Sequence, residues 1–293
     1  MENIVTFSQL LEVTRRENKR ISRVFQELEA YMLEKTEEEI RNLIRRNLNV
    51  MMSSIEDGLK NYGLSPSGMS GEDAQKVLKR YKNGSKLPMS NLVGKILTYA
   101  IAVSEENQRM GRVVACPTAG SCGIVPAVFK GYTEEYGFSE DQQIDALITA
   151  GVIGKIVAQQ MNLAGAVGGC QAECGVASAM AAGAAVDLMK GSNEQIIHAA
   201  ALALKNIMGL VCDPVAGLVE VPCIKRNGFL AVHAVTASEM ALAGVQSFIP
   251  PDEVVQAVKQ AGVLMSPMFK ESSEAGLAVT ETAREVAKNL PNL

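Results

Sequence analysis

Three of the six cysteines lie where the sequence predicts breaks between helices. Cys212 and Cys223 bound the segment Cys-Asp-Pro-Val-Ala-Gly-Leu-Val-Glu-Val-Pro-Cys, and Cys170 follows directly after a Gly-Gly pair. Proline disfavours helix in the residue before it, and glycine permits backbone conformations that other residues avoid. We therefore expect Cys212 and Cys223 on non-helical backbone between two helices, and Cys170 at a similar boundary.

Three thiols at three chain breaks favour a shared metal or cluster, because loops position functional groups whereas helix interiors mostly pack. A free cysteine is also among the most buried residue types and can simply pack as a small hydrophobe. The sequence has neither a zinc-type C-x-x-C pair nor a ferredoxin-type cysteine run. Spacing alone therefore leaves both interpretations open, with the shared ligand somewhat favoured.

Four segments of the chain carry a family resemblance, and they follow one another in order: 117–126, 168–173, 212–227 and 269–278. They closely resemble the alpha chain of bacterial iron–sulfur L-serine dehydratase, over about residues 65 to 278. The resemblance implies that Cys170, Cys212 and Cys223 hold a [4Fe-4S] cluster with one iron left free for the substrate, L-serine. It also implies a lyase that forms pyruvate and ammonia, and a cluster that oxygen damages.

The implied reaction removes a poor leaving group, hydroxide, and a weakly acidic α-proton. An iron with an open coordination position can act as a Lewis acid on the β-hydroxyl. No residue stands out as the base for the α-proton. His198 and His233 both lie in apolar helical stretches, where a lone histidine is more often a packed residue than a base, so the base stays unassigned.

Glycine-rich turns that lead into helices offer backbone N–H groups to a substrate carboxylate. Two turns fit this description, at 118–121 and 65–71, although such turns are commonly just turns and caps. The resemblance favours the first turn and adds a lysine from the last matching segment. The candidate substrate contacts are Ser65, Ser67, Thr118, Ala119, Gly120, Ser121 and Lys270.

Two acids, Glu173 and Asp213, lie within three residues of the expected ligands. They are either caps or solvated carboxylates, or they make hydrogen bonds that tune the cluster. Arg226 and Asn227 are their candidate partners. The remaining thiols fall outside the three-ligand pattern, and a structural role is favoured for them: Cys116, Cys122 and Cys174.

Composition excludes several other classes of protein. The 293 residues are 47% hydrophobic, which supports a sizeable core, and the net charge of −4 argues against a nucleic-acid-binding face. Aromatic residues are 4% of the chain. The N-terminus has no signal-type segment and no window is a convincing membrane span, so we expect a cytoplasmic protein with reduced thiols.

The periodicity predicts an all-α protein of many helices, because no stretch keeps a two-residue alternation. We expect one helix over 8–35, then a second that begins at a Thr36–Glu39 capping box and ends near Gly63. These two form a charged hairpin, so the predicted division is 1–62 and 63–293, forming one continuous unit. The Ala/Gly-rich stretch that ends at Met189 is expected to pack closely on all sides.

The resemblance also implies a partner. Single-chain members of the family carry a further N-terminal domain that matches a separate beta chain, so we expect a beta chain to complete this enzyme. Some members end in a cysteine that reaches the cluster, whereas this sequence ends in Asn-Leu-Pro-Asn-Leu. Two alternatives stay open: a desulfidase or dehydratase for cysteine, threonine or a related amino acid, and a non-catalytic iron–sulfur scaffold or sensor. A pyridoxal-phosphate lyase is disfavoured, since no phosphate loop or Schiff-base lysine is recognisable.

Overall fold

The computed structural model describes residues 4–82 and 88–290. The expected all-α class is confirmed: within these ranges there is no strand, and one isolated bridge pairs Cys212 with Lys270. None of the described helices is long and apolar enough to cross a membrane. Residues 291–293, which complete the Asn-Leu-Pro-Asn-Leu ending noted above, lie outside the described ranges. In chain order the α-helices are α1 (Phe7–Glu17), α2 (Ile21–Met32), α3 (Glu37–Lys60), α4 (Asp73–Lys82), α5 (Asn91–Gln108), α6 (Ile124–Tyr136), α7 (Glu140–Gln160), α8 (Gly165–Gly168), α9 (Val176–Leu188), α10 (Asn193–Asn206), α11 (Cys223–Leu242), α12 (Pro251–Leu264) and α13 (Glu281–Asn289).

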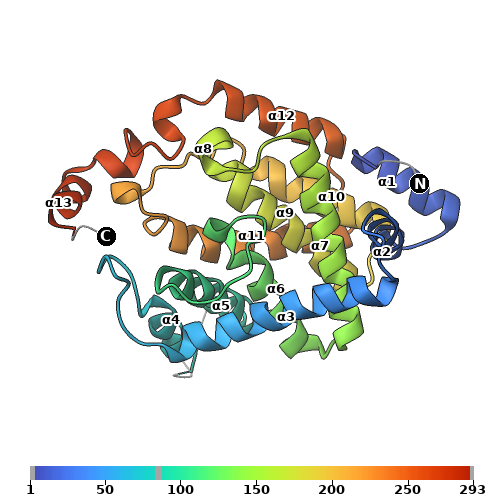
Figure 1. The fold of residues 1–293 in the computed structure, drawn as a ribbon, viewed down its shortest axis with the longest axis horizontal. Helices are drawn as coiled ribbons and strands as arrows, with labels where there is room; N and C mark the ends of the chain where they lie inside the picture. Colours follow the sequence, from blue (N-terminus) through green and yellow to red (C-terminus); the bar gives the residue numbers. More distant parts are fainter. Residues whose placement is uncertain (1–3, 83–87, 291–293) are drawn as a thin grey trace.

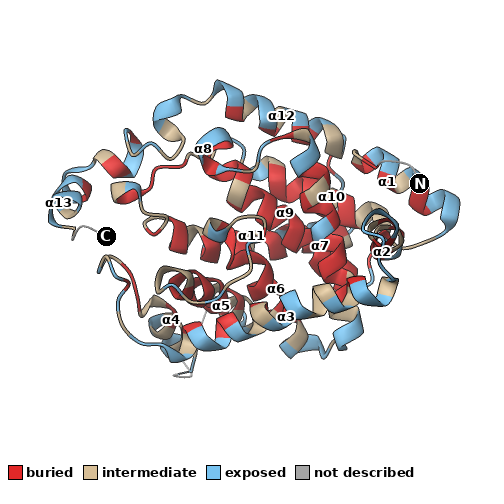
Figure 2. Cartoon of the chain, in the orientation of Figure 1, coloured by how far each residue is buried: buried red, intermediate tan, exposed pale blue. Residues whose placement is uncertain are grey.

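Helix α9 is the buried centre of the molecule, as its Ala/Gly-rich sequence predicts. Every residue of it is buried, and helices α6, α7, α10 and α11 pack around it (Figure 1). Figure 2 shows the buried residues concentrated on these helices. At Gly183 an added Cβ would collide with the Ile153 side chain of α7. The small side chains of α9 therefore allow its neighbours to approach closely.

The single helix expected over 8–35 is wrong. The chain forms two helices, α1 and α2, which are separated where Asn18 adopts a left-handed conformation with φ of 51°. Asparagine accepts this conformation more readily than most residues. The apolar residues on which the prediction depended all lie in α2, so the pattern carried no information about the residues before Ile21.

Helix α3 begins at the predicted capping box of Thr36 and Glu39. Its apolar stripe packs on the chain's own helices α5, α6 and α7, and Leu48, Met51 and Ile55 are buried there. One hydrophobic core takes in residues from both sides of position 62. The division into 1–62 and 63–293 stays a prediction, and the two parts share one hydrophobic core.

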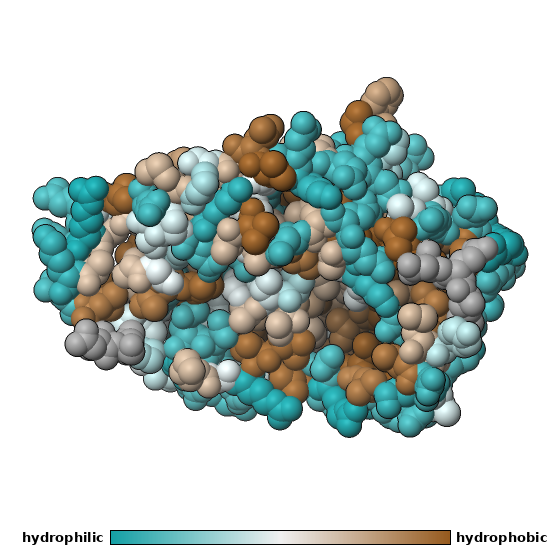
Figure 3. Space-filling model, turned by 45° about the horizontal axis from the view of Figure 1, so that its top comes forward, coloured by the Kyte–Doolittle hydropathy of each residue, from teal (hydrophilic) through white to brown (hydrophobic). Residues whose placement is uncertain are grey.

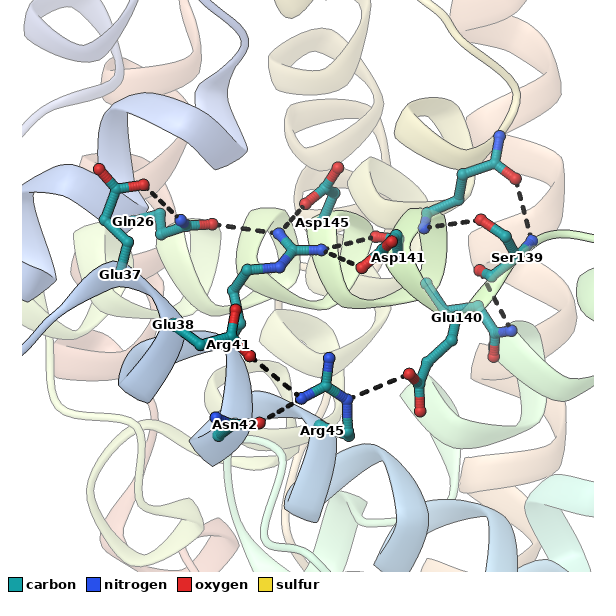
Figure 4. Close-up of polar contacts among 12 residues, drawn as sticks. Gln26, Glu37, Glu38, Arg41, Asn42, Arg45, Ser139, Glu140, Asp141 and Asp145 are labelled. Atoms are coloured by element: carbon teal, nitrogen blue, oxygen red, sulfur yellow. Dashed lines mark hydrogen bonds and ion pairs between the residues drawn. The ribbon is translucent and has the colours of Figure 1, made fainter.

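Arginine side chains of α3 set its orientation against α7 (Figure 4). Arg41 donates to Asp145 at 2.6 Å and to Asp141 at 2.8 Å, and Arg45 donates to Glu140 at 3.1 Å. The acids are largely exposed, and exposed pairs contribute only about 0–1 kcal/mol each. The pairs therefore align the two helices more than they stabilise them.

Candidate functional site

Cys170 lies between α8 and α9, where the chain changes direction. Gly169 precedes it with φ of 76°, and an added Cβ there would lie 2.9 Å from a backbone oxygen, so the position requires glycine. Gln171 fixes the turn from the other side: its amide donates to the Val258 carbonyl at 3.0 Å and accepts from the Gly209 N–H at 2.8 Å. Cys170 thus begins a π-helical turn whose backbone is held on both flanks.

Cys212 lies on extended backbone between α10 and α11, as expected. Its N–H donates to the Phe269 carbonyl at 2.8 Å, and its carbonyl accepts from the Glu271 N–H at 2.9 Å. This exchange is the isolated bridge opposite Lys270. Two segments of the sequence that were singled out separately, around 212 and around 270, are therefore neighbours through their backbones.

The expectation of non-helical backbone is wrong for Cys223, which is the first residue of α11. Proline restricts the residue that precedes it, and Pro222 precedes Cys223 rather than following it. Asn227 pairs with neither candidate acid. Its amide group donates to the carbonyls of Gly120 at 2.7 Å and Cys223 at 3.0 Å, so it ties the 118–121 turn to α11.

The structure brings Cys170, Glu173 and Cys212 together. The two sulfurs and a carboxylate oxygen lie within 4.8 Å of one another, an arrangement that could hold a metal ion. Gly165 lines the same space, since an added Cβ would lie 2.6 Å from a Glu173 oxygen and 3.2 Å from the Cys212 sulfur. Cys223 is buried but is not a member of this close group.

The thiols of this group are not equivalent. Hydrogen bonds donated by Cys174 and Cys212, together with the positive charge of Arg226, hold the pKa of Cys170 well below its usual range. The same hydrogen bonds, with burial, raise the pKa of Cys174 and of Cys212. Burial and the Cys170 thiolate raise the pKa of Glu173 to about 7. Among these thiols, the surroundings of Cys170 favour the thiolate form most.

Arg226 joins three parts of the site. Its guanidinium contacts the Cys170 sulfur at 3.4 Å, donates to the Val211 carbonyl at 3.0 Å and pairs with Asp213 at 2.8 Å. The other oxygen of Asp213 accepts from the Leu277 N–H at 2.8 Å. This pair therefore links the turn of Cys170, the segment of Cys212 and the chain beyond residue 270.

The predicted turn 118–121 faces the group of thiols. An added Cβ on Gly120 would lie 3.8 Å from both oxygens of Glu173, and the Thr118 hydroxyl hydrogen-bonds that carboxylate. Ser121 is fully buried and its hydroxyl lies 3.2 Å from that of Thr118. The Ala119 carbonyl faces the other way, toward Asn107 of α5.

Ser65 and Ser67 are not members of the close group of thiols and lie on the loop between α3 and α4. Their hydroxyls donate to the buried carboxylate of Glu220. Glu220 was not singled out from the sequence, because its partners are 150 or more residues away along the chain. Gln171 was missed for the same reason: it lies in the resembling segment 168–173, but its partners Val258 and Gly209 are far away along the chain.

The surroundings of Cys116, Cys122 and His233 fit the structural role that the sequence favours for them. Burial raises the pKa of Cys116 and of Cys122 to about 12, so both stay protonated. His233 contacts the Ser178 hydroxyl at 2.8 Å and the Asn206 amide at 2.9 Å. Both ring nitrogens of this histidine are thus occupied by its own fold.

These features define a buried, thiol-lined site with metal-binding geometry in an all-α protein. The chain belongs to the serine dehydratase alpha chain family, whose model matches residues 10–278. The resemblance stated from the sequence is therefore confirmed.

Individual relatives match over most of the chain. A protein of Bacillus subtilis named "Probable L-serine dehydratase, alpha chain" is 43% identical over 282 residues, which are 96% of this chain and 93% of the relative. The "L-serine dehydratase, alpha chain" of Peptoniphilus asaccharolyticus is 39% identical over 254 residues, 87% of each chain. The "L-serine dehydratase" of Streptomyces coelicolor is 39% identical over 265 residues, which are 86% of this chain and 57% of that longer relative.

Proposed function

We propose that this chain is the alpha chain of an L-serine dehydratase, a lyase that converts L-serine to pyruvate and ammonia. The observation that carries the proposal is the convergence of Cys170, Glu173 and Cys212 in a chain that the family model matches from residue 10 to 278. The relatives from Bacillus subtilis and Peptoniphilus asaccharolyticus bear this activity in their names.

The proposed cofactor is a [4Fe-4S] cluster with Cys170, Cys212 and Cys223 as ligands. The donor set supports it, since all three thiols are buried and thiolates are the ligands of iron–sulfur clusters. Arg226 offsets the negative charge that such ligands bring. When bound with only three thiolates, the cluster supplies an iron with an open position that acts as a Lewis acid on the β-hydroxyl.

The chain's own residues would orient the substrate. The turn 118–121 offers backbone N–H groups to the substrate carboxylate, and Lys270 would add positive charge nearby. Ser65 and Ser67 already donate their hydroxyl protons to Glu220, so their lone pairs are what they offer a substrate. These lone pairs would accept hydrogen bonds from the ammonium group of the substrate. Asp213 and Arg226 would keep the ligands in place rather than touch the substrate.

A partner completes the proposal. The match covers 57% of the longer Streptomyces coelicolor relative, and two relatives that it covers to 93% and 87% are named alpha chains. We infer a separate beta chain that closes the site and contributes polar groups to it. Cysteine or threonine as the preferred substrate is the alternative within the same chemistry.

The test is anaerobic purification of the full chain, followed by an absorption spectrum, iron and sulfide analysis and a serine-to-pyruvate assay with and without the beta chain. We expect about four irons per chain by the proposed cofactor, turnover of serine, and loss of activity in air. A chain with one zinc and no sulfide would contradict the proposal. A panel of serine, threonine and cysteine identifies the substrate.

A further inference from the structure

Glu220 is a buried carboxylate that the proposed chemistry does not use. It lies between Cys212 and Cys223 in the sequence and only 2% of it is exposed. Burying a carboxylate is costly unless hydrogen bonds replace the lost water. The partners of Glu220 therefore show what this carboxylate does.

Three serine hydroxyls converge on Glu220, all from one loop between α3 and α4. Ser65 and Ser70 donate to one carboxylate oxygen, and Ser67 donates to the other at 2.6 Å. The loop also closes on itself, since the Ser65 N–H donates to the Ser70 carbonyl at 2.8 Å. The carboxylate thus acts as the single acceptor around which the loop 65–70, hereafter the serine loop, is folded.

The hydrogen bonds are of a strong kind, because each joins a hydroxyl to a charged acceptor. Because Ser65 and Ser70 are buried, loss of the acceptor would leave their hydroxyl groups without a hydrogen bond, which is costly. The serine loop has no helix or strand of its own. Its conformation therefore depends on Glu220 more than on local backbone structure.

The segment of Glu220 also reaches the group of thiols. Its neighbour Val219 lies against the 118–121 turn, since an added Cβ on Gly120 would be 3.0 Å from Val219 Cγ1. The same Cβ would be 3.8 Å from the Glu173 carboxylate. The Val219 carbonyl is held by Gln108 of α5 at 2.7 Å. The serine loop is thus linked to the candidate metal ligand Glu173 through Glu220, Val219 and Gly120.

We propose that Glu220 is a positioning residue that holds the serine loop closed beside the site and thereby sets the affinity for the amino-acid substrate. This inference rests on the proposed function for its effect on the substrate, but the closure of the loop does not depend on any activity. Glu220 itself touches no reacting atom.

The test compares Glu220→Gln, which keeps the size and removes the charge, with Glu220→Asp, which keeps the charge on a shorter arm. Hydrogen exchange of the full-length chain should show the amides of Ser65 and Gly68 exchanging about tenfold faster in Glu220→Gln, by loss of charge-assisted hydrogen bonds. In the reconstituted enzyme with its beta chain, KM for serine should rise about tenfold while kcat stays within about twofold. In Glu220→Asp, the amide exchange and the KM should lie between those of the wild type and of Glu220→Gln. The iron content should be the same in both variants.

The matched control is Asp187→Asn. Asp187 is also a buried carboxylate; it lies in the last turn of α9, at the end away from Cys170, and is held by Arg20 and Thr149. Asp187→Asn should lower the free energy of unfolding without faster amide exchange in the serine loop. Unchanged exchange and unchanged KM in Glu220→Gln would overturn the proposal, and so would a loss confined to kcat. Faster exchange in a chain that never converts serine would instead overturn the proposed function and leave the role of Glu220 in the loop standing.

Discussion

Cys170 is the residue on which the polar contacts of the site converge. It receives hydrogen bonds from two thiols and a contact from Arg226, whereas Cys116 and Cys122 sit in apolar surroundings that keep them protonated. A cysteine binds a metal as its thiolate, and a positively charged neighbour such as Arg226 favours that form. This environment marks Cys170 alone, because the pKa of Cys212 and of Cys223 is raised, as it is for Cys116 and Cys122.

The first prediction concerns the thiols. Cys170→Ser, Cys212→Ser and Cys223→Ser should each abolish cluster assembly and turnover, because too few thiolates remain, while circular dichroism shows the helices intact. Cys116→Ser and Cys122→Ser are matched controls of equal burial and should keep the chromophore. Cys174→Ser should keep it as well. Full iron occupancy in any of the first three variants would remove that cysteine from the ligand set.

Arg226 carries the second prediction. Arg226→Gln should lower iron retention about tenfold to a hundredfold, the usual cost of removing a group that orients metal ligands. The measurement is iron loss to a chelator under anaerobic conditions. Lys225→Gln is the control, because this neighbouring cation pairs with Asp73 on α4 instead. Equal retention in both variants would show that Arg226 contributes no more than surface charge.

At this scale the sequence predicted residue types better than contacts. It singled out Cys170 and Cys212 at glycine- or proline-marked breaks and Glu173 as an acid three residues from Cys170, and the structure joins these three. It could not reveal Glu220, because the contact depends on how α3, α4 and α11 pack. It also misjudged Cys223, since the proline beside it restricts the preceding residue.

On the scale of the helices, the packing of α9 positions the turn of Cys170. Helix α9 begins directly after the turn of Cys170, so the turn is continuous with a helix that is buried along its whole length. Its sequence of small residues predicted this burial. The break between α1 and α2 was missed because left-handed asparagine leaves no periodic signature. Patterns thus predict where helices pack, and miss single residues that interrupt them.

The third prediction tests the packing of α9 with two glycines. Gly183→Ala should lower the free energy of unfolding by about 1–3 kcal/mol through overpacking against Ile153. Gly151→Ala, in the middle of α7, should raise it by about 0.5–1 kcal/mol, because nothing lies within 4 Å of the added Cβ and alanine favours helix. Denaturant unfolding measures both. A stabilising Gly183→Ala would show that the interface has room to spare.

On the scale of the whole molecule, several apolar side chains near the turn of Cys170 are exposed. Val263 and Leu264 at the end of α12 are 72% and 77% exposed, and Val167 on the contacting helix α8 is 49% exposed. Val167 is three residues before Cys170. Figure 3 shows apolar patches among hydrophilic ones on one face of the molecule. Exposed apolar groups that gather at one place commonly mark a protein interface.

The fourth prediction is that the beta chain covers this end of α12. Leu264→Asp should weaken binding of the beta chain about tenfold or more, because a charge replaces an apolar contact in the interface. Phe248→Asp is the control: Phe248 is 95% exposed and precedes the other end of α12, about 20 Å away at 1.5 Å per residue. Titration calorimetry with the cluster-loaded chain measures both affinities, and serine turnover before and after adding the beta chain measures the consequence. Turnover at full rate without the beta chain would make this chain self-sufficient, and equal affinities for the two variants would place the interface elsewhere.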